Sequence, residues 1–98
     1  MVDVKAELRE MRNLNRRKIE NDLTSKYASL FEQLSPLEQE VMAECYINGK
    51  SYGSCGHKIA YCERQVYRIV KRSIDKLIII CNIPNILYSY KKRYLIGT

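Results

Sequence analysis

The first 34 residues of this chain contain neither glycine nor proline, the two residues that most readily interrupt a helix. Apolar side chains recur there in steps of three and four, which places them on one face of an α-helix. The stripe comprises Val4, Leu8, Met11, Ile19, Leu23, Tyr27, Leu30 and Leu34, with Asn15 filling one gap. We therefore predict one long helix over residues 3–34, which either folds back on the rest of the chain or pairs with a second copy as a homodimer. An alternative is that the polar stretches at residues 13–15 and 21–22 divide it into two helices.

The sequence Ser35-Pro36-Leu37-Glu38 predicts the start of the next helix. Ser35 is a good helix cap, proline suits the first helical position, and Glu38 follows the cap by three residues as in a capping box. This helix should end at Asn48-Gly49. Its inward side chains should be Leu37, Val41, Met42, Cys45 and Tyr46.

Two further helices are predicted after Gly49. Ser51 can cap a helix that covers about residues 52–60. Cys62-Glu63 opens another helix that reaches about Ile80, and Pro84 ends any continuation because it lacks an amide donor. No strand-like alternation occurs before residue 83.

The predicted fold is therefore all-α, with a long N-terminal helix followed by a helix-turn-helix bundle. Residues 1–34 form an N-terminal arm that dimerises or contacts a protein partner. Residues 35–80 form the helix-turn-helix domain, and residues 81–98 form a basic, tyrosine-rich tail. The chain has 98 residues, enough for one modest core.

Charge is unevenly distributed along the chain. The formal net charge is +6, yet residues 50–98 hold ten basic and two acidic groups, and residues 35–49 hold three acidic groups and no basic one. A basic excess in one half favours a polyanionic partner such as nucleic acid.

The helix from Glu63 has two distinct faces. Val66, Val70, Ser73, Ile74 and Leu77 share the side that should seat it on the core. A helix fits the major groove of B-DNA, where arginine bonds guanine and glutamine bonds adenine, while more distant basic residues neutralise phosphates. The alternative is an ordinary solvated basic face. The candidate DNA-binding residues are Glu63, Arg64, Gln65, Tyr67, Arg68, Lys71 and Arg72.

The segment from Leu34 to Leu77 resembles region 4 of the sigma-70 family, which reads the −35 promoter element and touches the RNA polymerase flap. The resemblance rests on Leu34-Ser35-Pro36-Leu37-Glu38, Gly49-Lys50-Ser51-Tyr52 and Cys62-Glu63-Arg64-Gln65-Val66-Tyr67-Arg68-Ile69. It implies double-stranded promoter or operator DNA as partner, together with RNA polymerase.

The resemblance also implies roles for individual positions. Glu63, Arg64 and Arg68 would contact bases, the other four candidates would flank or hold the backbone, and Gly56 would fill a small-residue position between two close helices. Gly53 and Ser54 replace an acidic pair common in the family, and the extra glycine costs the helix about 1 kcal/mol. Nothing resembles region 2, so the chain alone should not open a promoter.

The whole chain is similar to small phage proteins of the RinA and ArpU type, in which a charged helix precedes such a unit. This similarity implies a phage-encoded activator of late genes or a regulator of packaging and lysis genes. Two alternatives are an interaction module that binds polymerase or a sigma factor through the arm and the acidic helix 36–48, and a small terminase-like packaging adaptor.

Other functional classes have little support in the sequence. A single histidine, His57, and no glycine-rich phosphate loop leave no catalytic cluster, so we expect neither an enzyme nor a cofactor. The four cysteines lack a Cys-x-x-Cys pair, and we interpret them as reduced thiols rather than a zinc site or a redox switch. The longest apolar run, Leu77–Cys81, is far too short to cross a membrane, and the acidic, polar N-terminus favours the cytoplasm.

Overall fold

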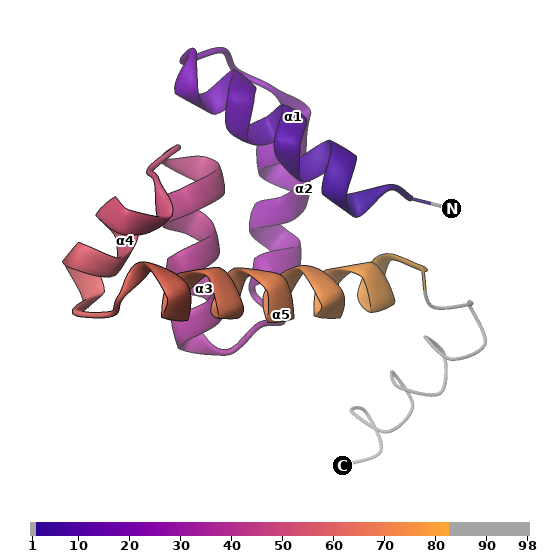
Figure 1. Cartoon of the computed structure of the whole chain (residues 1–98). Coiled ribbons are helices and arrows are strands. Elements are labelled where there is room, and N and C mark those ends of the chain that lie inside the picture. The colour runs from indigo at the N-terminus through magenta and orange to yellow at the C-terminus, as the bar shows by residue number, and fades with distance from the viewer. Residues whose placement is uncertain (1, 83–98) are drawn as a thin grey trace.

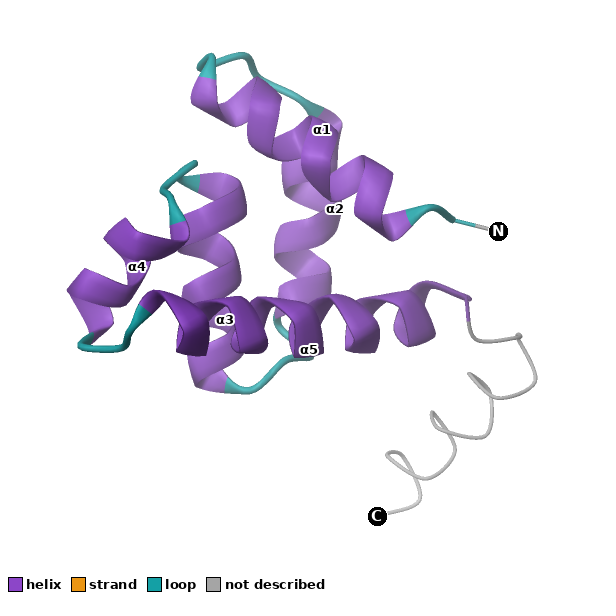
Figure 2. Cartoon of the chain, viewed as in Figure 1, coloured by secondary structure: helices purple, strands orange, loops and turns teal. Residues whose placement is uncertain are grey.

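A computed structural model describes residues 2–82, and every regular element in that range is a helix (Figure 2). The all-α prediction is therefore confirmed for this part of the chain. The tyrosine-rich basic tail lies outside the described residues from Ile83 onward. The elements in chain order are α1 (Val4–Arg16), α2 (Asp22–Phe31), α3 (Pro36–Met42), the π-helix η1 (Ala43–Ile47), α4 (Tyr52–Ile59) and α5 (Glu63–Asn82).

The prediction of a single helix over residues 3–34 is wrong, because this segment forms the two helices α1 and α2 (Figure 1). Lys18 adopts a left-handed backbone conformation with φ of 59° between them. The Asn21 side chain accepts a hydrogen bond of 3.0 Å from the Thr24 amide and so caps α2. Asn15 donates to the Thr24 hydroxyl at 2.9 Å and to the Tyr46 carbonyl at 3.0 Å, which fixes the turn against η1.

Breaking the helix lets both halves of the N-terminal apolar stripe fold back on the rest of the chain. Ile19 lies in the turn and is 41% exposed, whereas the stripe residues on both helices that flank it enter the core. That core is one cluster with members from every helix. Its buried residues are Val4, Leu8, Met11, Tyr27, Phe31, Leu34, Val41, Met42, Cys45, Tyr46, Cys55, Val66, Ile69, Val70 and Leu77.

Helix α3 begins with the predicted capping box. The Glu38 amide donates to the Ser35 hydroxyl at 3.4 Å, and the Ser35 amide donates back to the Glu38 carboxylate at 3.0 Å. The helix continues as η1, and the chain leaves it at Asn48-Gly49 as predicted. Gly49 has φ of +71°, and a side chain there would also collide with Arg16.

Helix α4 is capped by Ser51 as predicted, with the Ser54 amide donating to its hydroxyl at 3.1 Å. Ala60 then takes a left-handed conformation with φ of 62°, so that a short link leads into α5. At Gly56 an added Cβ would overlap the Tyr61 carbonyl and lie 3.1 Å from a Val66 methyl carbon. Glycine therefore permits the close approach of α4 to α5, as the resemblance to sigma region 4 implies.

Helix α5 runs across the front of the molecule in Figure 1, with α4 at one end and α3 behind it. Its buried side packs on both α3 and α4. At its far end Asn82 binds the start of the chain, where the Val2 amide donates to its side chain at 2.9 Å. This placement leaves the outer side of α5 open along its first turns.

Candidate nucleic-acid interface

The two faces predicted for α5 are present. Val66, Val70, Ser73 and Leu77 are buried and Ile74 is half-buried. Ile69, which is not in the predicted set, is buried with them. The Ser73 hydroxyl is satisfied by the Ile69 carbonyl at 2.7 Å, which removes the cost of burying it. This packing holds the opposite face of the helix outward.

All seven candidate DNA-binding residues lie in α5 and are exposed. Arg64, Arg68 and Lys71 follow one another at spacings of four and three, which places them on one line directly opposite the buried face. Within residues 2–82 none of these three has a carboxylate partner within ion-pair distance. They therefore form an open row of positive charge, which we call the outer row.

Arg72 differs from the outer row because it is already paired. Its Nε lies 3.0 Å from the carboxylate of Glu38, and Lys76 Nζ lies 2.9 Å from the other oxygen of the same group. Burial by itself would raise the pKa of Glu38, but the hydrogen bonds from Lys76 and its neighbours outweigh burial and lower it to about 2. Arg72 thus joins α5 to α3, a role that the sequence did not reveal.

Gln65 also has a structural partner. Its side-chain oxygen accepts a hydrogen bond of 2.9 Å from the Cys62 amide and closes the first turn of α5. The side chain remains exposed, beside the outer row rather than within it.

A second ion-pair cluster neutralises the acidic stretch that precedes α4. Glu44 is buried and lies 2.7 Å from Lys58 Nζ and 2.9 Å from Lys50 Nζ. Hydrogen bonds from these two lysines lower its pKa to about 2 although burial opposes the shift. Of the three carboxylates between residues 35 and 49, only Glu40 is exposed.

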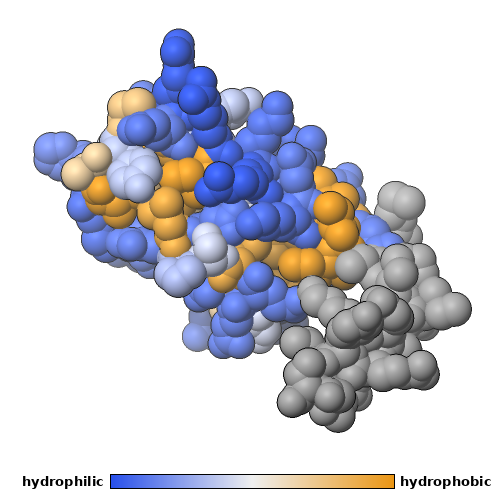
Figure 3. Space-filling model, turned by 90° about the horizontal axis from the view of Figure 1, so that it is seen from below, coloured by the Kyte–Doolittle hydropathy of each residue, from blue (hydrophilic) through white to orange (hydrophobic). Residues whose placement is uncertain are grey.

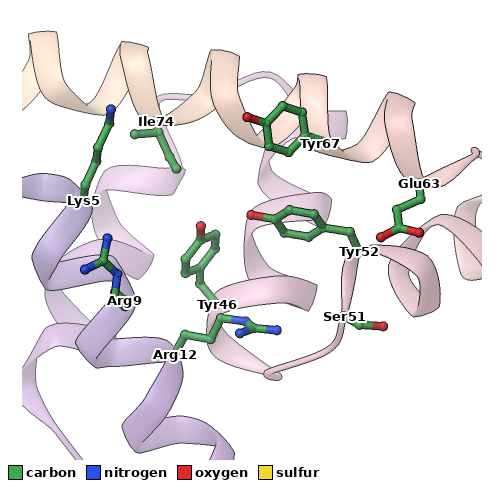
Figure 4. Close-up of a pocket in the computed structure, with 9 residues that line it drawn as sticks. All are labelled: Lys5, Arg9, Arg12, Tyr46, Ser51, Tyr52, Glu63, Tyr67 and Ile74. Atoms are coloured by element: carbon green, nitrogen blue, oxygen red, sulfur yellow. The ribbon is translucent and has the colours of Figure 1, made fainter.

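Tyr67 and Glu63 face a groove between α1, α4 and α5 (Figure 4). Tyr52 of α4 lies beside Tyr67, with ring centroids 6.2 Å apart. The groove also contains three basic side chains of α1, Lys5, Arg9 and Arg12, which the sequence analysis did not select. Their spacing of four and three residues was visible in the sequence, but only the fold shows that this side of α1 faces α5.

The cysteines are dispersed through the fold. Cys45 and Cys55 are buried, Cys81 is half-buried, and Cys62 is exposed at the start of α5. Burial raises the pKa of the Cys45 thiol to about 12, so it stays protonated at neutral pH. His57 is exposed on α4. Among the described residues no three histidine, cysteine or acidic side chains come together as metal ligands would.

The surface seen in Figure 3 is mainly hydrophilic, with apolar areas separated by polar and charged residues. Within residues 2–82 no helix combines the length and the apolar character needed to cross a membrane. No protein-family model matches the chain, and no curated protein or solved structure matches it either.

Proposed function

We propose that this protein is a sequence-specific DNA-binding transcription regulator in which α4 and α5 act as a helix-turn-helix. The observation that carries the proposal is the outer row: Arg64, Arg68 and Lys71 project from the first turns of a helix whose opposite face is fixed in the core. A helix presented in this way fits the major groove, with its N-terminal residues nearest the bases.

The candidate residues have different roles in this proposal. Arg64 and Arg68 read bases, and the carboxylate of Glu63 is suited to accept a hydrogen bond from cytosine. Lys71 lies further along the helix and neutralises phosphate, while Gln65 and Tyr67 contact the duplex from the flanks. Arg72 contributes to the positive field, although Glu38 holds its guanidinium.

The resemblance to sigma region 4 and to small phage regulators extends the proposal to promoter DNA, late phage genes and the bacterial cytoplasm. In this extended proposal RNA polymerase is a second partner. A homodimer through residues 3–34 stays a prediction. Its surface would have to be the exposed residues of α1 and α2, because the apolar stripe is largely buried in the chain's own core.

The competing interaction module gains less support from the charges. It requires an acidic surface on residues 36–48, but Glu38 and Glu44 are both buried and paired with basic side chains. Basic side chains, by contrast, remain exposed on α5. This difference favours a polyanion as the partner.

The test is selection of binding sites from a random duplex library, followed by titration of the selected duplex by fluorescence anisotropy. Arg64→Ala should weaken binding to the selected duplex by about 1–3 kcal/mol and relax preference at one base pair. Lys71→Ala should weaken binding to all duplexes alike. Arg17→Ala is the matched control, since it removes one exposed charge at the α1–α2 turn, away from α5 (Figure 1). Equal affinity for every duplex at all salt concentrations would refute specific recognition.

A further inference from the structure

The groove between α1, α4 and α5 has features of a binding site for an anion. This open groove has a volume of about 610 Å³, and its lining residues come from α1, η1, α5 and the start of α4 (Figure 4). Basic side chains come from α1 on one side, and tyrosines come from the elements that face it. The six residues that carry the argument are Lys5, Arg9, Arg12, Tyr46, Tyr52 and Tyr67.

The basic side chains in the groove form no ion pair within residues 2–82. Lys5 and Arg9 are exposed, lie one helical turn apart and have no carboxylate partner among these residues. Arg12 is held differently, since its guanidinium donates to the Cys45 carbonyl at 3.2 Å and to the Lys50 carbonyl at 3.4 Å. These two neutral carbonyls fix the position of the guanidinium without offsetting its positive charge.

The three tyrosines line the groove with their aromatic rings and hydroxyl groups. Tyr46 is buried, Tyr52 is half-buried, and Tyr67 is 54% exposed at the rim. A phenolic hydroxyl can donate a hydrogen bond to a phosphate oxygen. Glu63 lies at the end of the groove next to α4, so an anion is favoured at the opposite end, near α1.

The groove is continuous with the outer row. A smaller adjoining hollow of about 170 Å³ is lined by Lys5 and Lys71 together with the acidic residue Asp75. Within residues 2–82 Asp75 forms no ion pair with either lysine, so exposed basic side chains continue from α1 past Tyr67 to the exposed side of α5. The opposite flank of α5 differs, because Arg72 and Lys76 are both bound to Glu38 there.

We infer that this groove binds the sugar–phosphate backbone of the duplex whose major groove receives α5, with Lys5 and Arg9 as phosphate ligands. The inference rests on the proposed function. A helix in the major groove has a backbone strand on each side, and the first helix of a helix-turn-helix crosses one of them. The groove lies between α1 and the two helices α4 and α5, so a backbone strand that passes the start of α4 meets the basic side chains of α1.

The experiment compares the double variant Lys5→Ala/Arg9→Ala with Arg17→Ala/Lys18→Ala in the full chain. Both remove two exposed charges from the N-terminal segment, but only the first alters the groove. Binding of the selected duplex is titrated between low and high salt. Losing two phosphate contacts should lower the slope of log affinity against log salt by about 1.8 and weaken binding on the order of tenfold at moderate salt.

Preference for the selected duplex over a random one should not change, because phosphate contacts carry no sequence information. Phosphate-ethylation interference gives a second readout. Ethylation at a few phosphates on one strand should block the wild-type protein and have no effect on Lys5→Ala/Arg9→Ala. A Lys5→Gln/Arg9→Gln variant should show the same loss of salt slope. If its unfolding midpoint equals that of the wild type, a folding defect cannot explain that loss.

The outcomes separate the two proposals. An unchanged salt slope with intact specific binding overturns the groove and leaves the proposed function standing. An equal loss of slope in Arg17→Ala/Lys18→Ala also overturns the groove, because net charge alone then explains the effect. Failure of the wild-type protein to bind any duplex overturns both.

Discussion

Glu38 illustrates how one residue can serve several elements. Its backbone amide donates to the Ser35 hydroxyl and so completes the cap of α3. Its fully buried carboxylate accepts hydrogen bonds from the Ser35 amide, Arg72 and Lys76. A buried carboxylate is costly unless it is paired and hydrogen-bonded, and here both oxygens have partners. The sequence identified Glu38 as a capping residue, but its ion pairs link positions 34 and 38 residues apart in the chain.

Replacing this carboxylate should make stability less dependent on pH. The pKa of Glu38 lies below its ordinary value of 4.5, so its contribution is present above that pH and is lost as the pH falls toward about 2. Glu38→Gln should lower the free energy of unfolding by about 1–3 kcal/mol at neutral pH, and the difference from wild type should shrink below about pH 4.5. Urea titrations at a series of pH values measure this.

The control for that experiment is Glu40→Gln, since Glu40 is the exposed carboxylate two positions along the same helix. It should change stability by less than about 0.5 kcal/mol. A Glu38→Gln effect of constant size from neutral to acidic pH would show that the carboxylate charge contributes nothing.

At the scale of elements, the sequence predicted helices more reliably than the breaks between them. Caps at Ser35 and Ser51 and the end at Gly49 were predicted because each depends on a few neighbouring residues. For the break after α1 the spacing of apolar residues favours one continuous helix, with two helices as the alternative. Asn21 lies at this break as the cap of α2. Whether a polar residue ends a helix depends on how much apolar surface the segment buries when it folds back, and the spacing of residues in the sequence does not show this.

The contact of α4 with α5 can be tested at its two glycines. Gly56→Ala should destabilise the protein by about 1–3 kcal/mol, because the new methyl group would overlap the Tyr61 carbonyl. Gly53→Ala is the matched control on the same helix, where the nearest atom is a Glu63 carboxylate oxygen 3.8 Å away. It should stabilise by about 0.5–1 kcal/mol through its higher helix propensity.

The urea concentration at the midpoint of unfolding measures both changes in stability, provided that the dependence of the unfolding free energy on urea stays the same. If Gly56→Ala were as stable as Gly53→Ala, the close approach of α4 to α5 would be refuted.

At the scale of the whole molecule, α1 and α2 contribute to the same core as the helices that carry the candidate site. Val4, Leu8 and Met11 of α1 and Tyr27 and Phe31 of α2 are buried in it. Each large side chain contributes roughly 1.5–3 kcal/mol when buried, and total stabilities are about 5–15 kcal/mol. Together the five side chains contribute about as much as the whole stability of a small domain.

A fragment of residues 35–98 should therefore fail to fold cooperatively. Circular dichroism during heating should give a broad, non-cooperative change for the fragment and a sigmoidal transition for the full chain. A sigmoidal transition in the fragment would show instead that residues 35–80 fold alone, with the boundary that the sequence analysis placed at residue 34.

The sequence by itself determined the helical class, the caps of α3 and α4 and the two faces of α5. Each of these follows from local rules of spacing and capping that act within a few residues. Only the tertiary structure decided that the N-terminal segment folds as two helices, that Arg72 is bound to Glu38, and that Lys5 and Arg9 line one groove with Tyr67. These features join residues far apart in the chain, and burial and charge pairing select among such contacts only when the whole core is assembled.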